Sequence, residues 1–461
     1  MSRPKPRSNY GGRHVRNDVR AVLPFRSTSK SRQVLACRNA LSGRCATGVS
    51  PAADIEPFEG RNTMTPKYAA LKAALLGSAL TISTVGYAQD IKIGFNGDLS
   101  ASPSAQSGQA GVLGIQAAIE DINAAGGVLG RKLALVVRDD LSQPPKSIQN
   151  MSDLIDNEKV VAVLGPTNSG NALAWKHIPN QKKNPSIGCI GSATDITKPA
   201  GANADNYMYR VSMVDRAQVA GLIAYAKNNP STKKVGYLVE TTGYGQGGLK
   251  DLQELGEAKG VKPLAVEKFG VNDTDMTSQL NKMKAAGVDT VLVWAQGTPI
   301  GQLVRSMEKI DYFPVTLTSW SSDNASFFDT AGKALAEKPI FMRTITEDRT
   351  PKQQQLYDRL APKMASKSAF SFAAHCYDAT MITAAAIKQA GSTEGPKMRE
   401  ALENLETPVE GIMKTYDKPF SATEHEALTA SDYRWTRWKD GKLVSYSDDV
   451  VQALKPSDFT Q

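Results

Sequence analysis

Short apolar runs alternate with longer amphipathic segments along the chain from residue 90 onward. A continuous apolar run of about four to eight residues is typical of a strand buried on both faces, whereas apolar residues that recur every three or four positions indicate a helix. The runs IKIGF, KLALVV, VVAVLG and SIGCIG each precede a helical or loop segment. This repeated order predicts a parallel sheet with helices on both faces.

A second series follows YMYRV, with the apolar runs VGYLVE, PLAVEKF, DTVLVWA and PVTLTSW. The residues after KPIFMRT have mostly helical periodicity and lead into a polar tail that contains DYRWTRWKDGKLVSY. We therefore predict an α/β fold with two open, doubly wound parallel-sheet lobes. Ligands of open parallel sheets bind beyond the carboxyl ends of the strands, and clefts between domains are common ligand sites. The cleft between the lobes is the expected site.

The net charge of +9 and the pI of about 9.1 are typical of a nucleic-acid-binding protein until their distribution is considered. Residues 1–88 carry 14 Lys and Arg against 4 Asp and Glu, which leaves 41 against 42 in the remainder. The body of the protein is therefore near neutral, and we expect no nucleic-acid partner.

The basic leader contains an export signal. Residues 64–88, MTPKYAALKAALLGSALTISTVGYA, place two lysines ahead of an apolar run and end in small residues, which predicts a signal peptide cleaved before Gln89. The run is too short for a transmembrane helix, and no Cys follows it to carry a lipid. Residues 1–63 could be a transit peptide, but a complete signal behind them favours a non-native or disordered extension. We expect a soluble periplasmic protein.

The cysteines and histidines show no metal-binding spacing. Cys37 and Cys45 fall in the leader, and Cys189 and Cys376 fall in apolar segments. A disulfide is allowed in the periplasm, but two lone cysteines in such segments are more often buried thiols, and the alternative stays open. The mature chain keeps three mutually distant histidines, His177, His375 and His425. We predict no metal, no cofactor and no catalytic residue.

The segment GPTNSGNA at residues 165–172 begins like a phosphate-binding loop, with Gly165 and Gly170 after a strand. It then has Asn171 and Ala172 where such a loop has Lys and a hydroxyl residue, so it lacks the cation that a polyphosphate needs. A helix that starts near Ser169 would present free N–H groups that suit a single carboxylate. In the alternative, Ser169 only caps its own helix.

The next predicted strand ends in GSATDIT, which brings Ser192, Ala193 and Thr194 to the same edge of the sheet. A second pair of hydroxyls at a neighbouring strand end should converge on the first. Ser, Thr and Asp also favour turns, which is the alternative interpretation of this segment.

The segment TTGYGQGG fits the dinucleotide fingerprint with Gly243, Gly245 and Gly248, and Glu267 follows near the end of the next strand. Polar residues precede the first glycine, and an exported protein rarely meets NAD, so we do not favour this hypothesis. Tyr244 then either projects into the cleft or packs on the sheet.

The chain resembles the type I periplasmic solute-binding proteins of ABC importers, of the leucine/isoleucine/valine-binding kind. The motifs that carry the resemblance, in order, are GDLSASPSAQSGQAG, IQAAIEDINAAGGVLGRKLALVVRDD, GPTNSGNALA, GSATDIT, YRVSMVDRAQVAG, TGYGQGG and YDATMITAAAIKQAG. The resemblance implies a hinged, two-lobed protein without enzymatic activity. It implies lobe 1 at residues 90–212 plus 345–430 and lobe 2 at residues 213–344 plus 431–461.

The resemblance also implies roles for single residues. Ser169 matches the serine that holds the α-carboxylate of the ligand, and Ser192 and Thr194 match positions that hold its carboxylate and amino group. Tyr244 matches an aromatic residue that packs on the ligand from the second lobe.

The chain departs from the family pattern where a glutamate pairs with the α-ammonium of an amino acid, because Trp320 stands there. Leaving an ammonium unpaired in a dry cleft costs several kcal/mol, and a cation–π contact returns only about 1–2 kcal/mol. Asp323 lies nearby and is a candidate substitute. Ser107 and Gln296 stand where aromatic walls are common, so the cleft has room for a ring.

The expected function is that of the substrate-binding component of an ABC transporter, which captures a small carboxylate and delivers it to an inner-membrane permease. A branched-chain or related amino acid is the family default. The alternative is an aromatic or aliphatic carboxylate without an ammonium, on which Trp320 would stack. A second alternative is a ligand-sensing receptor subunit. We expect a monomer that closes around its ligand.

Overall fold

The computed structural model describes residues 89–201 and 205–460. The predicted extension at residues 1–63 and the predicted signal peptide at residues 64–88 lie outside the described residues. Within the described part, no helix is both long enough and apolar enough to cross a membrane.

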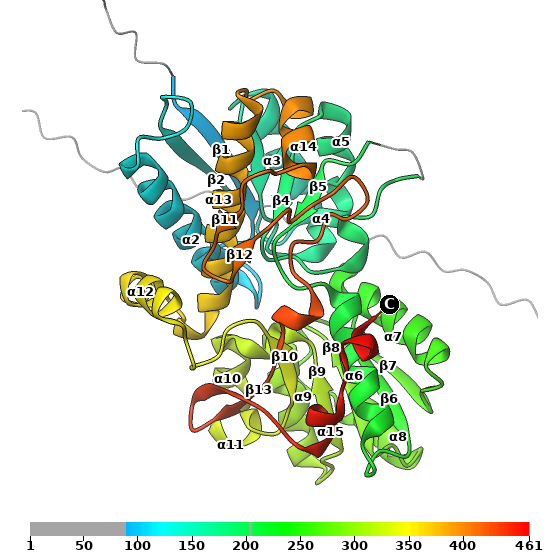
Figure 1. Ribbon diagram of the computed structural model, residues 1–461. Coiled ribbons are helices and arrows are strands. Elements are labelled where there is room, and N and C mark those ends of the chain that lie inside the picture. Colours follow the sequence, from blue (N-terminus) through cyan, green and yellow to red (C-terminus); the bar gives the residue numbers. More distant parts are fainter. Residues whose placement is uncertain (1–88, 202–204, 461) are drawn as a thin grey trace, which may run out of the picture. The chain divides into compact units, whose positions relative to one another are not determined.

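The first sheet is parallel, with strand order β2-β1-β3-β4-β5 (Figure 1). Its strands are β1 (Ile91–Gly97), β2 (Leu133–Asp139), β3 (Ala162–Leu164), β4 (Ser186–Gly188) and β5 (Met208–Arg210). The helices that follow them are α2 (Ala105–Ala124), α3 (Pro144–Asp156), α4 (Ser169–Trp175) and α5 (His177–Lys182). Two later helices, α13 (Phe370–Ala390) and α14 (Gly395–Glu403), return to this lobe. The predicted order of strands and helices is confirmed here.

The second sheet is also parallel, with strand order β7-β6-β8-β9. Its strands are β6 (Val235–Glu240), β7 (Ala265–Phe269), β8 (Thr290–Trp294) and β9 (Val315–Thr318). Its helices are α6 (Asp215–Asn228), α7 (Gly243–Ala258), α8 (Thr277–Ala285), α9 (Gly297–Lys309), α10 (Ala325–Ala331) and α11 (Lys333–Ala336). The predicted α/β fold with two parallel-sheet lobes is therefore confirmed.

The burial of the strands explains why their sequences are apolar runs. Every residue of β6 and β8 is buried, because helices cover both faces of the central strands. The edge strand β7 instead alternates, and Val266 is exposed. The continuous apolar runs of β6 and β8 therefore mark the centre of the second sheet, and the alternation of β7 marks one of its edges.

The segment predicted as a polar tail is a β-hairpin, so that prediction was wrong. β13 (Arg434–Lys439) pairs with β14 (Lys442–Ser445) and with β10 (Phe341–Arg343) in an antiparallel sheet. The turn uses Asp440 and Gly441, both at positive φ, and Asp-Gly between two short strands is the hairpin signal that the charged residues obscured. The remaining elements are α12 (Pro351–Leu360), β11 (Val409–Glu410), β12 (Thr415–Tyr416) and α15 (Asp449–Ala453).

A disulfide joins the first sheet to α13. Cys189, directly after β4, bonds Cys376, with the two Cα atoms 4.9 Å apart and a sequence separation of 187. The sequence leaves the pairing of these two cysteines open, and the structure shows that α13 returns across the first lobe and places Cys376 over Cys189. Helix α2 lies against α13 so closely that a Cβ on Gly114 would be 2.0 Å from the carbonyl oxygen of Ala373.

Candidate ligand-binding site

A cavity of about 270 Å³ lies where the carboxyl ends of the strands of both sheets meet. The first lobe contributes the loops after β1, β2, β3 and β4, and the second lobe contributes the loops after β6, β8 and β9. Helix α13 adds Phe372. The volume is slightly below the range of about 300–1,000 Å³ that is usual for drug-sized ligands, so the cavity suits a small metabolite.

The lining of this cavity is polar but uncharged. Within the described residues, it contains no Asp, Glu, Lys, Arg or His. Most of the side chains are hydroxyls and amides of Ser, Thr, Asn and Gln, joined by Tyr244 and Trp320. The apolar side chains are those of Pro144, Ile190 and Phe372. The cavity can therefore donate and accept many hydrogen bonds but offers no fixed charge.

Most of the predicted site residues meet in this cavity, namely Ser107, Ser169, Ser192, Tyr244, Gln296 and Trp320. Ala193 and Thr194 do not line it. The hydroxyl of Thr194 donates to Asp251 Oδ2 at 2.6 Å and accepts from the amide of Arg216 at 3.0 Å, so it faces the second lobe. The amide of Ala193 donates to Ser169 Oγ at 3.1 Å.

Ser169 is the first residue of α4, a helix of seven residues whose N-cap is Asn168. Its hydroxyl does not cap that helix. Oγ accepts from the amides of Ser192 at 3.2 Å and Ala193 at 3.1 Å, which leaves the hydroxyl hydrogen to donate elsewhere. Gly165 at the end of β3 has φ +105°, and a Cβ there would be 2.4 Å from the carbonyl oxygen of Asn96, so this position requires glycine.

Trp320 connects the second lobe to Ser192. Its indole Nε1 donates to Ser192 Oγ at 3.1 Å, and its amide donates to Gln218 Oε1 at 3.2 Å. Its ring lies 4.8 Å from that of Phe372, and only 3% of the residue is exposed. Phe372 was missed in the sequence because nothing in the apolar stretch FSFAAHC distinguishes a cavity residue from a core residue.

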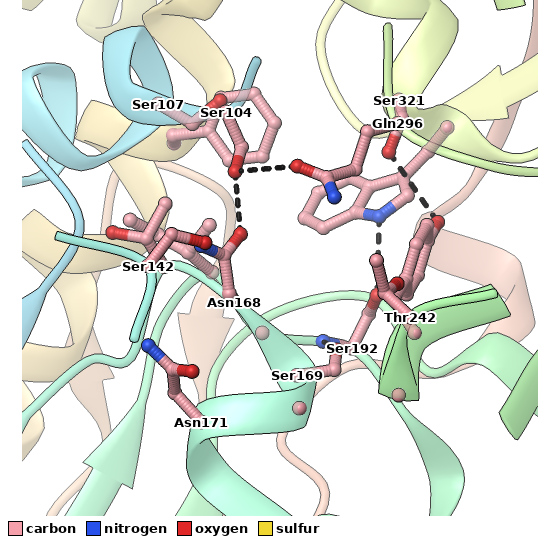
Figure 2. Close-up of a pocket in the computed structure, with 18 of the residues that line it drawn as sticks. Ser104, Ser107, Ser142, Asn168, Ser169, Asn171, Ser192, Thr242, Gln296 and Ser321 are labelled. Carbon is pink, nitrogen blue, oxygen red and sulfur yellow. Dashed lines mark hydrogen bonds between the residues drawn. The ribbon is translucent and has the colours of Figure 1, made fainter. Parts of the chain in front are cut away.

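A second group of hydrogen bonds occupies another part of the cavity (Figure 2). Ser104 Oγ contacts Asn168 Oδ1 at 2.5 Å and Gln296 Oε1 at 3.1 Å, and Asn168 Nδ2 donates to Ser142 Oγ at 2.6 Å. Gln296 is held from behind by Glu240, which accepts from its side-chain and backbone N–H groups. Ser104, Ser142 and Asn168 were not predicted, because serine and asparagine are ordinary loop residues.

Two carboxylates are buried behind the residues that line the cavity. Asp323, the candidate substitute for the missing glutamate, is fully buried behind the lining, where Ser371 Oγ donates to it at 3.3 Å and Arg343 Nε lies 3.7 Å away. Glu240 is also fully buried, and burial raises its pKa. Neither residue lines the cavity, so neither reaches a ligand there as the structure stands.

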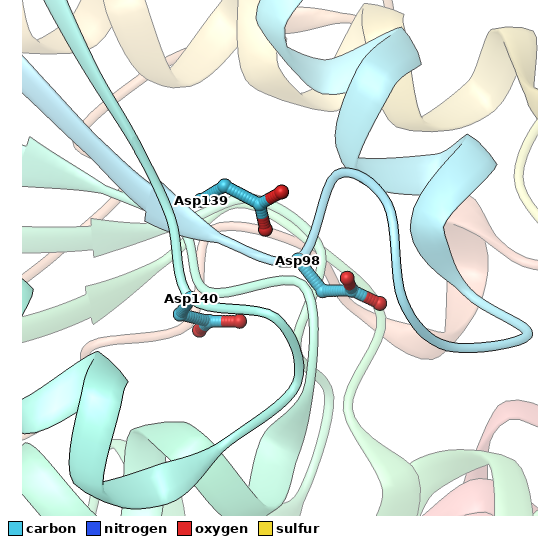
Figure 3. A group of neighbouring side chains, drawn as sticks. All are labelled: Asp98, Asp139 and Asp140. Carbon is cyan, nitrogen blue, oxygen red and sulfur yellow. The ribbon is translucent and has the colours of Figure 1, made fainter. Parts of the chain in front are cut away.

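Three further carboxylates, Asp98, Asp139 and Asp140, come together at the ends of β1 and β2 (Figure 3), with oxygens within 4.8 Å of one another. Each accepts hydrogen bonds from its own surroundings: Asp98 from backbone amides of the following loop, Asp139 from the amide of Leu99, and Asp140 from Asn171 Nδ2. These donors fix the loops that carry Ser104 and Ser142. The cluster therefore has a structural use without a cation.

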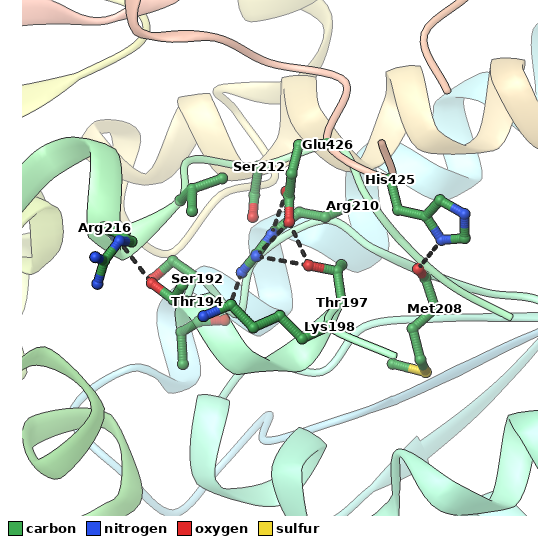
Figure 4. A network of polar contacts seen from close by, with 12 residues as sticks. Ser192, Thr194, Thr197, Lys198, Met208, Arg210, Ser212, Arg216, His425 and Glu426 are labelled. Atoms are coloured by element: carbon green, nitrogen blue, oxygen red, sulfur yellow. Dashed lines mark hydrogen bonds and ion pairs between the residues drawn. The ribbon is translucent and has the colours of Figure 1, made fainter. Parts of the chain in front are cut away.

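Behind the Ser192 loop, defined as residues 191–197, lies a network of charged side chains (Figure 4). Arg210 is fully buried and donates from Nε and Nη2 to the two carboxylate oxygens of Glu426, each at 2.6 Å. Its Nη1 donates to the carbonyl oxygen of Ala193 at 2.8 Å, and its Nη2 donates to Thr197 Oγ1 at 3.1 Å. The ion pair thus holds the loop from the side opposite the cavity.

The glycines of the dinucleotide-like segment serve close packing in the first turns of α7. A Cβ on Gly245 would lie 2.0 Å from the carbonyl oxygen of Glu240, and one on Gly248 would lie 2.1 Å from the ring of Trp294. A Cβ on Gly243 would lie 2.8 Å from the Cα of Gly170 in the other lobe.

The rest of that dinucleotide-like pattern does not converge on the glycines. Glu267 pairs with Lys282 at 2.9 Å, on the outside of the sheet. Tyr244 lines the cavity, and its hydroxyl accepts from Ser321 Oγ at 3.4 Å.

The chain matches the periplasmic binding protein family over residues 90–442. It belongs to this family. It is 25% identical to the Leu/Ile/Val-binding protein BraC3 of Rhizobium johnstonii over 374 residues, which cover 81% of this chain and 98% of that protein. The resemblance to leucine/isoleucine/valine-binding proteins is therefore confirmed, and the chain is a periplasmic binding protein related to solute-binding proteins.

Solved structures share its fold. The branched-chain amino acid binding protein LivJ of Streptococcus pneumoniae, solved with isoleucine, has a TM-score of 0.65 and 24% identity and covers 77% of this chain and 98% of its own. A solute-binding protein of Rhodopseudomonas palustris, solved with 3,4-dihydroxybenzoic acid, has a TM-score of 0.65 and 18% identity and covers 77% of this chain and 95% of its own. At these identities the two structures support the fold alone.

Proposed function

We propose that this periplasmic binding protein captures a small carboxylate in the cavity between its lobes and delivers it to an ABC permease in the inner membrane. The observation that carries the proposal is the uncharged lining, in which Ser169 and Ser192 lie side by side and the amide of Ser192 donates to Ser169 Oγ at 3.2 Å. We propose that these residues hold the carboxylate, and that the exported protein acts as a monomer after loss of residues 64–88.

Uncharged hydrogen-bond donors are suited to a carboxylate that binds reversibly. A buried carboxylate is stabilised by two or three hydrogen bonds from hydroxyl and N–H groups, because such bonds to a charged acceptor are stronger than neutral ones. A fixed Arg or Lys would bind more strongly but would itself be buried and unpaired in the empty cavity. The lining therefore favours one negative group on an otherwise uncharged ligand.

The same lining favours a ligand without an ammonium. Since no carboxylate lines the cavity, an α-ammonium would find only neutral acceptors and the face of an aromatic ring. The ring of Trp320, packed against Phe372, instead offers a flat apolar surface. An aromatic or aliphatic carboxylate without an ammonium is thus the ligand class that we favour.

A branched-chain or related amino acid is the second candidate. It is favoured by the names of relatives such as the Leu/Ile/Val-binding protein of Rhizobium johnstonii. The names of the relatives therefore favour an amino acid, whereas the cavity lining favours an acid without an ammonium. A ligand-sensing receptor subunit would use the same cavity, and only a transport assay with the cognate permease distinguishes it from a transport component.

The test compares acids that differ only in the amino group. Leucine against 4-methylpentanoate, and phenylalanine against 3-phenylpropanoate, are titrated into the protein by calorimetry. We expect the acid without the amino group to bind more tightly in at least one pair. Tighter binding of both amino acids would contradict the ammonium-free class and restore the second candidate.

The serine that we assign to the carboxylate provides the second arm. Ser169→Ala should weaken any acid that binds by about 5- to 150-fold, because a buried anion that loses a donor costs roughly 1–3 kcal/mol. Ser231→Ala is the matched control, since Ser231 is exposed and far from the cavity lining. Unchanged affinity in Ser169→Ala would remove this residue from the proposed site.

A further inference from the structure

One part of the cavity is equipped for a second kind of group on the ligand. We call it the polar end, and it consists of Ser104, Ser107, Ser142, Asn168, Gln296 and Asn324. Both lobes contribute to it, through the loops after β1, β2 and β3 and through those after β8 and β9. Each of its side chains is a neutral hydroxyl or amide.

The amides of the polar end are held in fixed orientations. Gln296 Nε2 donates to Glu240 Oε1 at 3.1 Å, so that Gln296 Oε1 is turned toward Ser104. Asn168 Nδ2 donates to Ser142 Oγ at 2.6 Å, so that Asn168 Oδ1 is also turned toward Ser104. Because these groups are positioned before a ligand arrives, little conformational entropy is lost when they bind one.

Other groups of the polar end keep hydrogen-bonding capacity for a ligand. Asn324 Oδ1 accepts from the amide of Phe327 at 3.2 Å and from Ser326 Oγ at 2.5 Å, which leaves Nδ2 to donate. Ser107 Oγ makes no hydrogen bond to another described residue. Both residues line the cavity and are only 2% exposed. A buried polar group without a partner costs about 1–3 kcal/mol, so a ligand that supplies partners here is selected over one that does not.

A hydrocarbon side chain does not meet this requirement. The apolar surface of the cavity is limited to Pro144, Ile190, Phe372 and the aromatic rings of Tyr244 and Trp320. A branched alkyl group at the polar end would cover hydroxyls and amides without bonding them. A second charged group is also disfavoured, because no ionisable Asp, Glu, Lys, Arg or His among the described residues lines the cavity.

We infer that the ligand is a hydroxylated or keto carboxylate, with a neutral oxygen-bearing group at the polar end and the carboxylate at Ser169 and Ser192. This inference rests on the proposed function for the carboxylate, and it adds the chemistry of the remainder of the ligand. Ser104 and Ser107 are its specificity-determining residues, since they contact the added oxygen and not the carboxylate.

The experiment measures affinity by calorimetry on the mature protein for acids with and without a hydroxyl. The probes are benzoate, 3-hydroxybenzoate, 4-hydroxybenzoate and 3,4-dihydroxybenzoate, together with butyrate and 4-hydroxybutyrate. We expect at least one hydroxylated acid to bind about tenfold or more tightly than its parent, as one or two buried hydrogen bonds provide. A panel in which no hydroxylated acid exceeds its parent, including one in which nothing binds, overturns the inference.

Variants separate this inference from the proposed function. Ser104→Ala and Ser107→Ala, alone and together, should reduce the preference for the hydroxylated acid over its parent acid to about threefold or less. Ser169→Ala should weaken both acids alike. A preference that survives the double variant overturns the assignment of Ser104 and Ser107.

Catechol tests whether the ligand needs a carboxylate at all, because it has the hydroxyls of 3,4-dihydroxybenzoate and no carboxylate. In one outcome, catechol binds as tightly as the acid and is weakened by the Ser104 and Ser107 variants. That result would support the assignment of the polar end and contradict the proposal that the ligand is a carboxylate. If catechol binds at least tenfold more weakly than the acid, the carboxylate proposal and the assignment of the polar end are both supported.

Discussion

The two sides of the Ser192 loop differ completely in charge. On the cavity side, Ser192 is surrounded by uncharged hydroxyls, amides and aromatic rings. On the opposite side, Arg210 and Glu426 form a bidentate ion pair that also bonds the carbonyl oxygen of Ala193 (Figure 4). The Ser192 loop thus lies between an uncharged cavity lining and a buried ion pair.

This difference shows that permanent charges belong behind the loop, where each has a partner, and not in the cavity. Behind the loop, each charge has a permanent partner, so its desolvation is offset and it fixes the backbone. In the cavity, a permanent charge would lack a partner whenever the ligand is absent. Neutral donors avoid this cost, because hydroxyls can bond one another in the empty cavity and turn to the ligand when it binds.

The largest expected effect comes from breaking the charged side. Glu426→Ala leaves Arg210 buried without its carboxylate, and the unfolding free energy should fall by about 3–5 kcal/mol, measured by urea denaturation. Glu394→Ala is the control, because Glu394 pairs with Lys397 on the surface and should cost less than about 1 kcal/mol. Equal losses in the two variants would mean that the buried pair does not fix the loop.

A smaller effect is expected from Thr194, which shares the loop with Ser192 but faces Asp251 in the second lobe. Thr194→Val removes a hydrogen bond that joins the lobes, so it should weaken every acid in the benzoate series by a similar factor of about tenfold. Calorimetry with the whole series measures this, and exposed Thr423→Val is the control. A loss confined to one acid would instead place Thr194 among the ligand contacts.

A third expected effect is a pH dependence of stability from Asp215, which lies behind Ser192 near Arg210 and Asp251. Burial raises the pKa of Asp215 from 3.8 to about 7, and its Oδ2 accepts from the indole Nε1 of Trp294 at 3.3 Å. The folded protein therefore binds a proton that the unfolded chain releases. The stability that this group contributes is fully present below pH ~4 and is lost as the pH rises through ~7.

The expected slope from this single group is at most about 1.4 kcal/mol per pH unit. Asp215→Asn should flatten the pH dependence of the unfolding free energy between pH ~4 and ~7, as measured by urea denaturation across that range. An unchanged slope would show that Asp215 is already ionised in the folded protein at low pH.

Much of the fold could be predicted because the strands are buried on both faces and therefore appear as apolar runs. Two features could not be read from the sequence, for different reasons. Cys189 and Cys376 meet only because α13 returns to the first sheet, and apolar periodicity does not reveal that return. The hairpin at β13 and β14 was hidden because its exposed positions are charged.

The candidate site could be predicted in part for a related reason. Ser169 and Ser192 follow apolar runs, so their place at strand ends can be inferred from the sequence alone. Thr194 could not be separated from Ser192, because the direction of a side chain in a short turn depends on what the opposite lobe offers, here Asp251. Phe372 and Asn168 look in sequence like core and loop residues.

Gly170 and Gly243 carry a consequence for the mechanics of capture. These residues belong to different lobes, and a Cβ added to Gly243 would lie 2.8 Å from the Cα of Gly170. The two lobes here approach each other through backbone atoms alone, with no side chain between them that could move aside. We therefore expect these two glycines to limit how far the two lobes can close, so that a ligand too large for the remaining cavity would hold the lobes apart.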